Sequence, residues 1–390
     1  MLKIDLFCRV VDNYGDIGVC WRLALQLTAE HGCTVRLIVD DLASFRMIAP
    51  DVRTDAPTQR WLGVDILMWA EAESLTPASV VIEAFACDPP DTYISAMAAQ
   101  AKSGQSPAWI NLEYLSAETW VDEVHGRASP HPRLPLTKYF FCPGFTHESG
   151  GLIREAGAAE AIPLSRLRER VGVRVPDGLS QVNDDGLRSC ATLTPAPVPL
   201  AGEGSRTCAA LAQRAAATTI LAFVYPQAPV LALAQGFAAA NLPTQVTLAA
   251  PVTNTSPDWQ TASPVPQTDF DALLAQFDFL IVRGEDSFVR AQWAAKPMLW
   301  HIYPTEDNAH LTKLDAWHER YCSGLEPTVA AAYRAASHAF NRGESSLESY
   351  AALAKILPQL AAHAALWRAG LMQQTDLATR LIRFVDRGTR

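Results

Sequence analysis

The sequence lacks several patterns that would assign a function at once. It contains no G-x-G-x-x-G run, so the dinucleotide-binding fingerprint is missing. No uninterrupted apolar run reaches the roughly 20 residues of a membrane-spanning helix. A strand is expected at residues 4–8, which leaves no room for a signal peptide before it. We therefore expect a cytoplasmic protein that does not interact with membranes.

Patterned cysteines and an excess of basic residues are also missing. The 8 cysteines are scattered, with no C-x-x-C pair and no Cys/His set at zinc spacing. We expect them to be reduced and mostly buried, and we expect no metal site. The formal net charge of −9 argues against nucleic-acid binding, which needs a basic face. The same charge is compatible with a basic or arginine-bearing target.

Apolar runs typical of strands alternate with helical spacing along the chain. The strands are expected at residues 4–8, 34–39, 80–85, 108–112, 217–225, 244–250 and 279–282. Such alternation is typical of parallel sheets covered by helices, so we expect an α/β protein. The 390 residues, 49% of them hydrophobic and 19% charged, suit two globular domains.

A glycine pair at residues 150–151 predicts the boundary between these domains. We expect a first Rossmann-like domain at residues 1–152 and a second at residues 153–365. Within the second, a stretch rich in Pro, Gly, Ser and Ala at about 175–206 predicts a variable loop.

The chain is organised around residues 282–304, which read VRGEDSFVRAQWAAKPMLWHIYP. A strand stops at a glycine there and feeds a helix headed by Glu285, Asp286 and Ser287, a turn that can receive phosphate on its backbone N–H groups. Arg283 adds a planar cationic fork. In the alternative reading, Asp286 or Ser287 caps the helix and Arg283 forms a solvated ion pair with Glu285.

A second polar turn occurs in residues 11–22, which read VDNYGDIGVCWR. The turn is expected at residues 12–18, with a helix from about residue 19 to 30. Its glycines let the backbone come close to a ligand. Asp12 and Asp16 lie four residues apart in it. Read separately, they form an Asx-turn and a helix N-cap; read together, they are a carboxylate pair facing a cleft.

These two motifs, in this order and about 270 residues apart, resemble the elongation factor P arginine rhamnosyltransferases, the EarP family. The run NLEYL at residues 111–115 resembles the same family. The resemblance implies the glycosyltransferase B architecture, with two Rossmann-like domains facing a central cleft and a C-terminal helix, about 366–390, packing back on the first domain. It also implies inverting transfer of L-rhamnose from dTDP-β-L-rhamnose to an arginine of translation elongation factor P, with no cofactor.

The resemblance assigns the nucleotide's phosphates and ribose to the second motif. Arg283, Asp286 and Ser287 carry these contacts, and Tyr303 is placed near the phosphates. Gly15 of the first motif is counted with the donor-binding residues. Arginine and the helix-start amides can neutralise a diphosphate without a metal ion.

The resemblance also assigns contacts to the thymine base. Phe270 matches an aromatic on which the family stacks thymine, and Gln267 matches a polar neighbour that can bond a thymine edge. Phe223 and Tyr225 are alternatives for a further base contact. Without the motif, a phenylalanine at helical spacing belongs in a core.

The acceptor side needs a base, because a guanidinium has a pKa above about 12 and is a poor nucleophile. We assign Asp16 as the general base and Asp12 as its orienting or acceptor-binding partner. The family resemblance makes Glu285 a residue needed for activity. His301 is expected to be structural.

Two other functions fit the same residues. One is a glycosyltransferase B enzyme that acts on a small molecule or a glycan. The other is a nucleotide-sugar-binding protein without catalytic activity.

Overall fold

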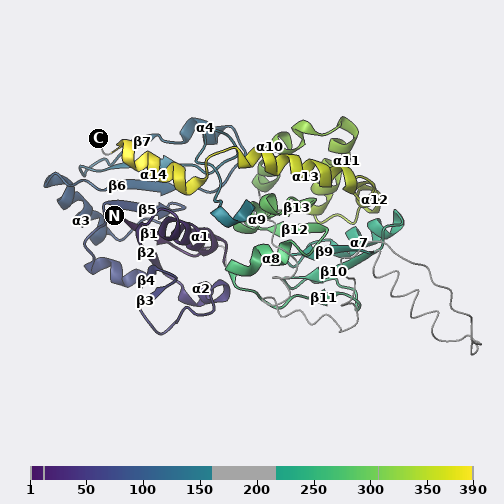
Figure 1. Cartoon of the computed structure of the whole chain (residues 1–390), viewed down its shortest axis with the longest axis horizontal. Helices are drawn as coiled ribbons and strands as arrows, with labels where there is room; N and C mark the ends of the chain where they lie inside the picture. Colours follow the sequence, from purple (N-terminus) through teal and green to yellow (C-terminus); the bar gives the residue numbers. More distant parts are fainter. Residues whose placement is uncertain (1, 12–13, 160–216, 306, 389–390) are drawn as a thin grey trace, which may run out of the picture.

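The chain folds into two halves, each built on one sheet (Figure 1). The computed structural model describes residues 2–11, 14–159, 217–305 and 307–388. Asp12 and the predicted variable loop at 175–206 therefore lie outside the described residues.

The first sheet has the strand order β3-β4-β2-β1-β5-β6-β8-β7. Its neighbours are parallel except at the two edges, where β3 and β7 run antiparallel to β4 and β8. The strands are β1 (Lys3–Cys8), β2 (Thr34–Val39), β3 (Thr58–Trp61), β4 (Val64–Met68), β5 (Val80–Ala84), β6 (Ala108–Leu112), β7 (Ala128–Pro130) and β8 (Thr137–Phe141).

Both faces of the central part of this sheet are buried, as the apolar sequences of β1, β5 and β6 require. Successive strand residues point to opposite faces, and Leu6 and Phe7 accordingly belong to two different core clusters. The covering elements are α1 (Gly15–Ala29), α2 (Leu42–Ile48), α3 (Asp91–Lys102), α4 (Trp120–Val124) and the 3-10 helix η1 (Trp69–Ser74).

The second sheet is parallel throughout, in the order β11-β10-β9-β12-β13. Its strands are β9 (Thr218–Ala222), β10 (Thr244–Leu248), β11 (Gln260–Thr261), β12 (Phe279–Arg283) and β13 (Met298–His301). The helices of this half are α7 (Val230–Ala239), α8 (Phe270–Leu274), α9 (Asp286–Ala294), α10 (Ala309–Tyr321), α11 (Pro327–Asn341), α12 (Leu347–Lys355) and α13 (Leu357–Met372). Short 3-10 turns are η2 (Ala156–Ala159), η3 (Gln267–Asp269) and η4 (Cys322–Gly324).

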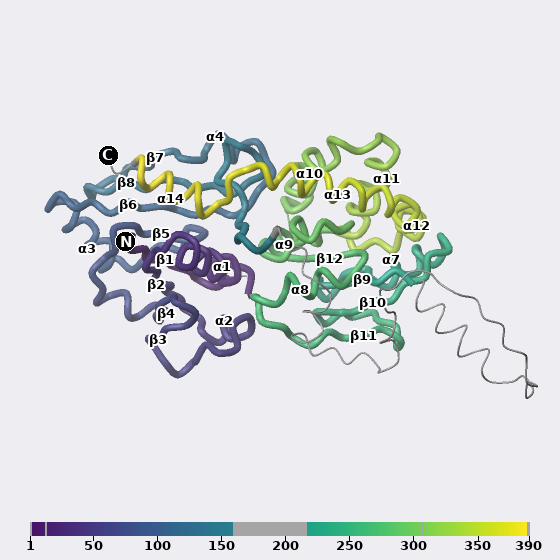
Figure 2. Tube along the Cα trace, viewed as in Figure 1, coloured from purple at the N-terminus to yellow at the C-terminus, as the bar shows by residue number. Residues whose placement is uncertain are grey.

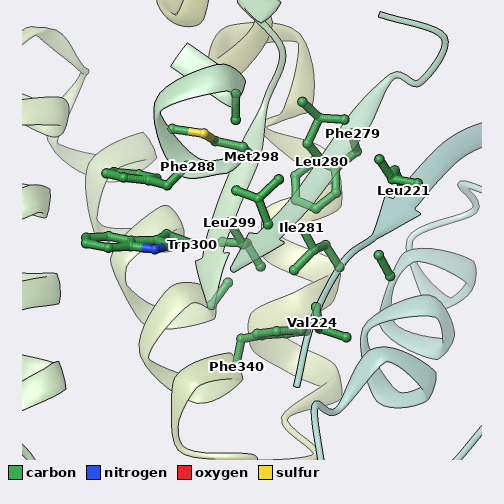
Figure 3. Close-up of a cluster of buried hydrophobic side chains, with 14 of the residues drawn as sticks. Leu221, Val224, Phe279, Leu280, Ile281, Phe288, Met298, Leu299, Trp300 and Phe340 are labelled. Atoms are coloured by element: carbon green, nitrogen blue, oxygen red, sulfur yellow. The ribbon is translucent and has the colours of Figure 1, made fainter. Parts of the chain in front are cut away.

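Aromatic packing holds α9 against the second sheet (Figure 3). The rings of Phe288 on α9 and Trp300 on β13 stack with 3.8 Å between their centres and 8° between their planes. Trp300 also donates its indole N–H to the carbonyl of Gly284, at 3.2 Å. The start of α9, where a ligand can bind, is therefore fixed by buried rings.

The chain crosses twice between the halves at one place. Leu377 N–H donates to the carbonyl of Leu152, at 2.8 Å, so the outgoing and returning segments are bonded to each other. The last helix, α14 (Leu377–Gly388), lies against the first half (Figure 2), where Leu377, Leu381 and Val385 join its core. Gly151 has a φ of +75° at this crossing, a conformation that favours glycine.

Each sheet has one switch point, where the strand order reverses. In the first sheet it falls between β1 and β5, and in the second between β9 and β12. Ligands of open α/β sheets bind outside the carboxyl ends of strands at such points. The turn after β1 leads to Asp16, and the segments after β9 and β12 begin with Phe223 and Gly284.

Two expectations about helices are wrong in detail. Helix α1 begins at Gly15 and not near residue 19, so the predicted turn at 12–18 is shorter. The C-terminal helix that packs back begins at Leu377 and not near residue 366, because α13 extends to Met372 within the second half. Asp376 caps the new helix by accepting from Thr379 N–H, at 3.0 Å.

Six cysteines are described, and all six are buried and free. Among the described helices, none combines the length and apolar character needed to cross a membrane.

Candidate active site

The phosphate-type turn of the second half forms as the sequence predicts. Strand β12 ends at Arg283, Gly284 takes a φ of +65°, and α9 begins at Asp286. Glu285 is the N-cap residue, and its side chain makes no capping hydrogen bond. The capping alternative for Asp286 or Ser287 therefore does not hold, and the first N–H groups of α9 remain available to a ligand.

Arg283 is held by aromatic rings. Its guanidinium carbon lies 4.8 Å from the ring centres of both Phe223 and Tyr225. Phe223 in turn meets the edge of Phe270, with 5.8 Å between centres. Within the described ranges no carboxylate lies in ion-pair range of Arg283, so the proposed solvated pair with Glu285 is not formed.

A cavity of about 320 Å³ lies between the two halves at this turn. Its second-half lining includes the base-contact candidates Phe223, Tyr225, Gln267 and Phe270 and all five residues from Arg283 to Ser287. Its first-half lining includes Tyr14, Gly15, Gly18, Met47 and Ile48. The two motifs found in the sequence thus form opposite walls of one space.

Asp16 is positioned by the first half. It is 2% exposed, and its carboxylate accepts from Val11 N–H at 2.8 Å and from the Tyr114 hydroxyl at 3.1 Å. The Tyr114 ring is stacked on Phe85, with 4.1 Å between centres and 11° between planes. Asp16 does not cap α1, whose N-cap is Tyr14, so the N-cap reading of this residue is wrong.

Glu285 faces Asp16 from the other half closely enough for their charges to interact. Burial raises the pKa of Glu285 to about 7, and the negative charges of Asp16 and Asp286 add to the rise. Lys313 and the N–H of Leu115, which donates to the Glu285 carboxylate, act in the opposite direction. Glu285 therefore changes its protonation state near neutral pH.

Asp286 and Gln267 use their polar groups to join the halves. Arg22 on α1 donates to both carboxylate oxygens of Asp286, at 2.6 and 3.2 Å. The Gln267 amide donates to the carbonyl of Gly18 and to Asp286, each at 2.8 Å. A Cβ on Gly18 would lie 3.1 Å from that amide, so this glycine permits close approach of the second half and not only of a ligand.

Ser287 and Tyr303 occupy different positions relative to the cavity. Ser287 lines it, but its hydroxyl turns back and donates to the carbonyl of Arg283. Tyr303 is 58% exposed and does not line the cavity; its ring meets the ring of Tyr225, with 5.4 Å between centres.

Comparison with known proteins decides the family. The profile of the family described as elongation factor P (EF-P) rhamnosyltransferase EarP matches residues 4–386. A protein-arginine rhamnosyltransferase of Pseudomonas putida is 42% identical, with 97% of each chain covered. That of Pseudomonas aeruginosa is 38% identical, covering 98% of this chain and 99% of its own.

A solved structure agrees with these relatives. It is described as the structural basis for EarP-mediated arginine glycosylation of translation elongation factor EF-P. It matches 99% of both chains with 28% identity and a TM-score of 0.56. The chain belongs to the EarP family. The glycosyltransferase B architecture expected from the sequence is confirmed.

An ion network that the EarP-family motifs alone do not reveal joins the two halves. Besides Asp286, Arg22 contacts Glu155 at 3.0 Å. Glu155 also pairs with Arg290, which is bonded to Asp271 by two nitrogens. Arg22 lies in the quoted first motif, but nothing in the spacing pairs it with residues 133 and 264 positions away.

His301 contacts the loop that follows β9. His301 is buried at the end of β13 and accepts from Tyr225 N–H, at 3.3 Å. Burial and the nearby charge of Arg283 lower its pKa to about 4, so the ring stays neutral. It supports the loop that carries Tyr225.

Proposed function

We propose that this protein transfers L-rhamnose from dTDP-β-L-rhamnose to an arginine side chain of translation elongation factor P. One observation carries the proposal: residues of both family motifs line a single cavity between the halves. The relatives' names and the EarP structure supply the sugar, the arginine and the protein acceptor. The nucleotide follows from the family resemblance of the second motif.

The second half binds the donor in this proposal. Thymine stacks on Phe270 beside Phe223, a contact worth roughly 1–3 kcal/mol. The diphosphate meets Arg283 and the free N–H groups at the start of α9. Ser287 and Tyr303 contact the phosphates only after the Ser287 hydroxyl leaves the Arg283 carbonyl and Tyr303, which lies outside the cavity, turns toward it. Gly15 approaches from the other wall.

Gln267 and Asp286 need a movement before they can contact the donor. Their amide and carboxylate groups are bonded to α1 through Gly18 and Arg22. Donor binding by these two residues is therefore coupled, in this proposal, to a loosening of the contacts between the halves.

Asp16 acts as the general base toward the acceptor. One guanidinium nitrogen attacks the anomeric carbon while the bond from that carbon to the diphosphate oxygen breaks. dTDP leaves with the bonding electrons, and Asp16 takes the proton from nitrogen. Attack from the face opposite the leaving group inverts the configuration, and no covalent sugar-enzyme intermediate is needed.

Glu285 and Asp12 support this step. Glu285 lies across from Asp16 and can bind the positive guanidinium when it is ionised. Asp12 precedes Asp16 by four residues in the first motif and is proposed to orient the acceptor. The proposal needs no metal ion, because Arg283 and the α9 amides supply positive potential at the diphosphate.

Two partners and one location follow from the proposal. The protein acceptor is elongation factor P and the small-molecule partner is dTDP-rhamnose, with no role for nucleic acid. A translation factor as acceptor places the enzyme in the cytoplasm.

Incubation with dTDP-rhamnose and elongation factor P tests the proposal. Intact mass spectrometry should show one added deoxyhexose, and fragmentation should locate it on one arginine. Asp16→Asn should lower the transfer rate at least about 100-fold, since general bases contribute that much. Its affinity for dTDP should stay within twofold of wild type, because Asp16 faces the acceptor.

The other outcomes are distinct. Transfer to a glycan or small molecule in place of the protein would identify a different glycosyltransferase B enzyme. Donor binding without transfer to any acceptor would identify a nucleotide-sugar-binding protein without catalysis. Loss of both dTDP binding and folding in Asp16→Asn would reduce Asp16 to a structural residue.

A further inference from the structure

Two histidines and an aspartate meet on the side of the second half formed by α10 and α11. Asp315 and His318 are one turn apart on α10 and share a face of that helix. His338 reaches them from α11, which packs beside α10 (Figure 1). One ligand atom from each of the three residues lies within 4.8 Å of the other two.

In the buried ring of His318, one of the two nitrogens makes no hydrogen bond to the described residues. Its Nε2 lies 2.9 Å from the Ser337 hydroxyl, whereas its Nδ1 has no hydrogen-bond partner among the described residues. That Nδ1 is directed into the cluster, 3.9 Å from the nearer oxygen of Asp315. The ring is fully buried, so bulk solvent does not reach this nitrogen.

A bound cation would give this unpaired nitrogen a partner. If Nε2 carries the proton and donates it to Ser337, the lone pair of Nδ1 faces the cluster. Metal-bound histidines characteristically donate their other N–H to such an oxygen, which fixes the tautomer. Asp315 supplies a negative charge that favours a cation. The positive charge of Arg334, which donates to the carbonyl of His318, disfavours one.

The distances between the ligand atoms need only a small adjustment to fit around a tetrahedral ion. Nitrogen and oxygen ligands of zinc lie roughly 3.3 Å apart, given bond lengths near 2.0–2.1 Å. The Asp315 oxygen is 2.8 Å from His338 Nε2 and 3.9 Å from His318 Nδ1. Asp315 is 54% exposed, so its carboxylate can move to equalise these two separations.

We propose that Asp315, His318 and His338 form a binding site for a first-row divalent metal ion such as Zn²⁺, which joins α10 to α11. Two imidazoles and a carboxylate suit this class of ion and leave one position for water. The histidines are 20 residues apart in sequence, outside the spacings that mark zinc sites, and this proposal departs from the expectation that the chain has no metal site.

A simple ion pair is the competing explanation. The Asp315 carboxylate and His338 Nε2 at 2.8 Å make a satisfactory pair without metal. That explanation leaves His318 Nδ1 without a role. His338 Nδ1 also lacks a partner among the described residues. The proposed site uses the other ring nitrogen of His338, Nε2, so Nδ1 is not a ligand of the ion.

Titration of the untagged, chelator-treated full-length protein with Co²⁺ tests the proposal. Visible absorption should saturate at one ion per chain, and Zn²⁺ should displace it. Zn²⁺ should also raise the melting temperature of wild type. His338→Ala and Asp315→Ala alter partly exposed residues and should fold, yet each should weaken Co²⁺ binding by more than about 10-fold.

Two further variants distinguish this site from adventitious binding. Ser337→Ala should weaken Co²⁺ binding by about 10- to 100-fold, because it removes the partner that fixes the His318 tautomer. His147→Ala changes an exposed histidine elsewhere and should leave binding unchanged. Absence of saturable binding in wild type, or binding that survives Asp315→Ala and His338→Ala, would overturn the proposal.

Discussion

Arg283 is a cation placed by aromatic packing, since its guanidinium lies over Phe223 and Tyr225 at equal distances. A guanidinium fixed in this way keeps its donors for a ligand. The sequence could predict the residue and its turn. It could not predict the two-ring contact, which needs the ends of β9 and β12 side by side.

Phe270→Ala tests the stacking role of the cavity wall. We expect the dissociation constant for dTDP, measured by calorimetry, to rise roughly 5- to 150-fold, as loss of 1–3 kcal/mol requires. Trp259→Ala removes an aromatic of the same half that does not line the cavity, and it should leave dTDP affinity unchanged. Equal affinity in Phe270→Ala and wild type would count against stacking.

Glu285 makes stability depend on pH in a predictable direction. Its pKa is raised to about 7, against about 4.3 in the unfolded chain, so between these values only the folded state holds the proton. Stability from this group is therefore lost as pH rises from about 4.3 to 7.

Glu285→Gln removes this pH dependence while keeping the side-chain shape. Urea unfolding of the wild type and the variant should be compared at pH 5 and pH 8. The variant should gain stability relative to wild type as pH rises. Because buried histidines titrate in both proteins, only the difference between them is diagnostic, and parallel pH profiles would refute the assignment.

At the level of elements, the strands were the easiest to predict, because buried parallel strands are apolar throughout. The predicted strand at 34–39 matches β2 from Thr34 to Val39, and that at 108–112 matches β6. Helix ends were harder. Helix α1 begins at Gly15 with a bond from Gly18 N–H to the Tyr14 carbonyl, and the side chain of its N-cap residue, Tyr14, makes no capping bond that could signal this start.

Contacts between distant elements were the least predictable part of the site. The Asp16 carboxylate is held by Tyr114, 98 residues away, and Glu285 is held by the N–H of Leu115. Both partners lie in the NLEYL segment, which the family resemblance singled out without assigning a role. The fold provides that role by placing this segment between the two carboxylates.

Gly151→Ala tests the crossing between the halves. Residue 151 has a φ of +75°, and an added Cβ would lie 2.9 Å from the carbonyl of Thr375. We expect a loss of about 1–3 kcal/mol in the free energy of unfolding, measured with urea. Gly157→Ala is the matched control, because a Cβ there meets nothing within 4 Å. Equal effects of the two substitutions would contradict the packing described.

For the whole molecule, the buried network around Arg22 sets how the halves meet. Arg22 comes from α1, and its partners Asp286 and Glu155 come from α9 and from the segment after the crossing. In Figure 2, α1 lies next to α9, which it contacts. The same carboxylate of Asp286 lines the cavity, so the network and the donor site share a residue.

Arg22→Met should destabilise the molecule by about 3 kcal/mol, the lower end of the range for breaking a buried pair, since Asp286 and Glu155 retain some exposure. Urea unfolding measures this loss. Arg53→Met breaks an ion pair with Asp55 whose side chains are 68% and 73% exposed, and it should leave stability nearly unchanged. Similar losses in both variants would argue against a network that joins the halves.

If the two motifs act across one cavity, a crystal structure with bound dTDP-rhamnose will show thymine against Phe270 and the diphosphate at Arg283 and the start of α9. The anomeric carbon will be open toward Asp16. A nucleotide bound outside this cavity, or a sugar directed away from Asp16, would contradict this arrangement.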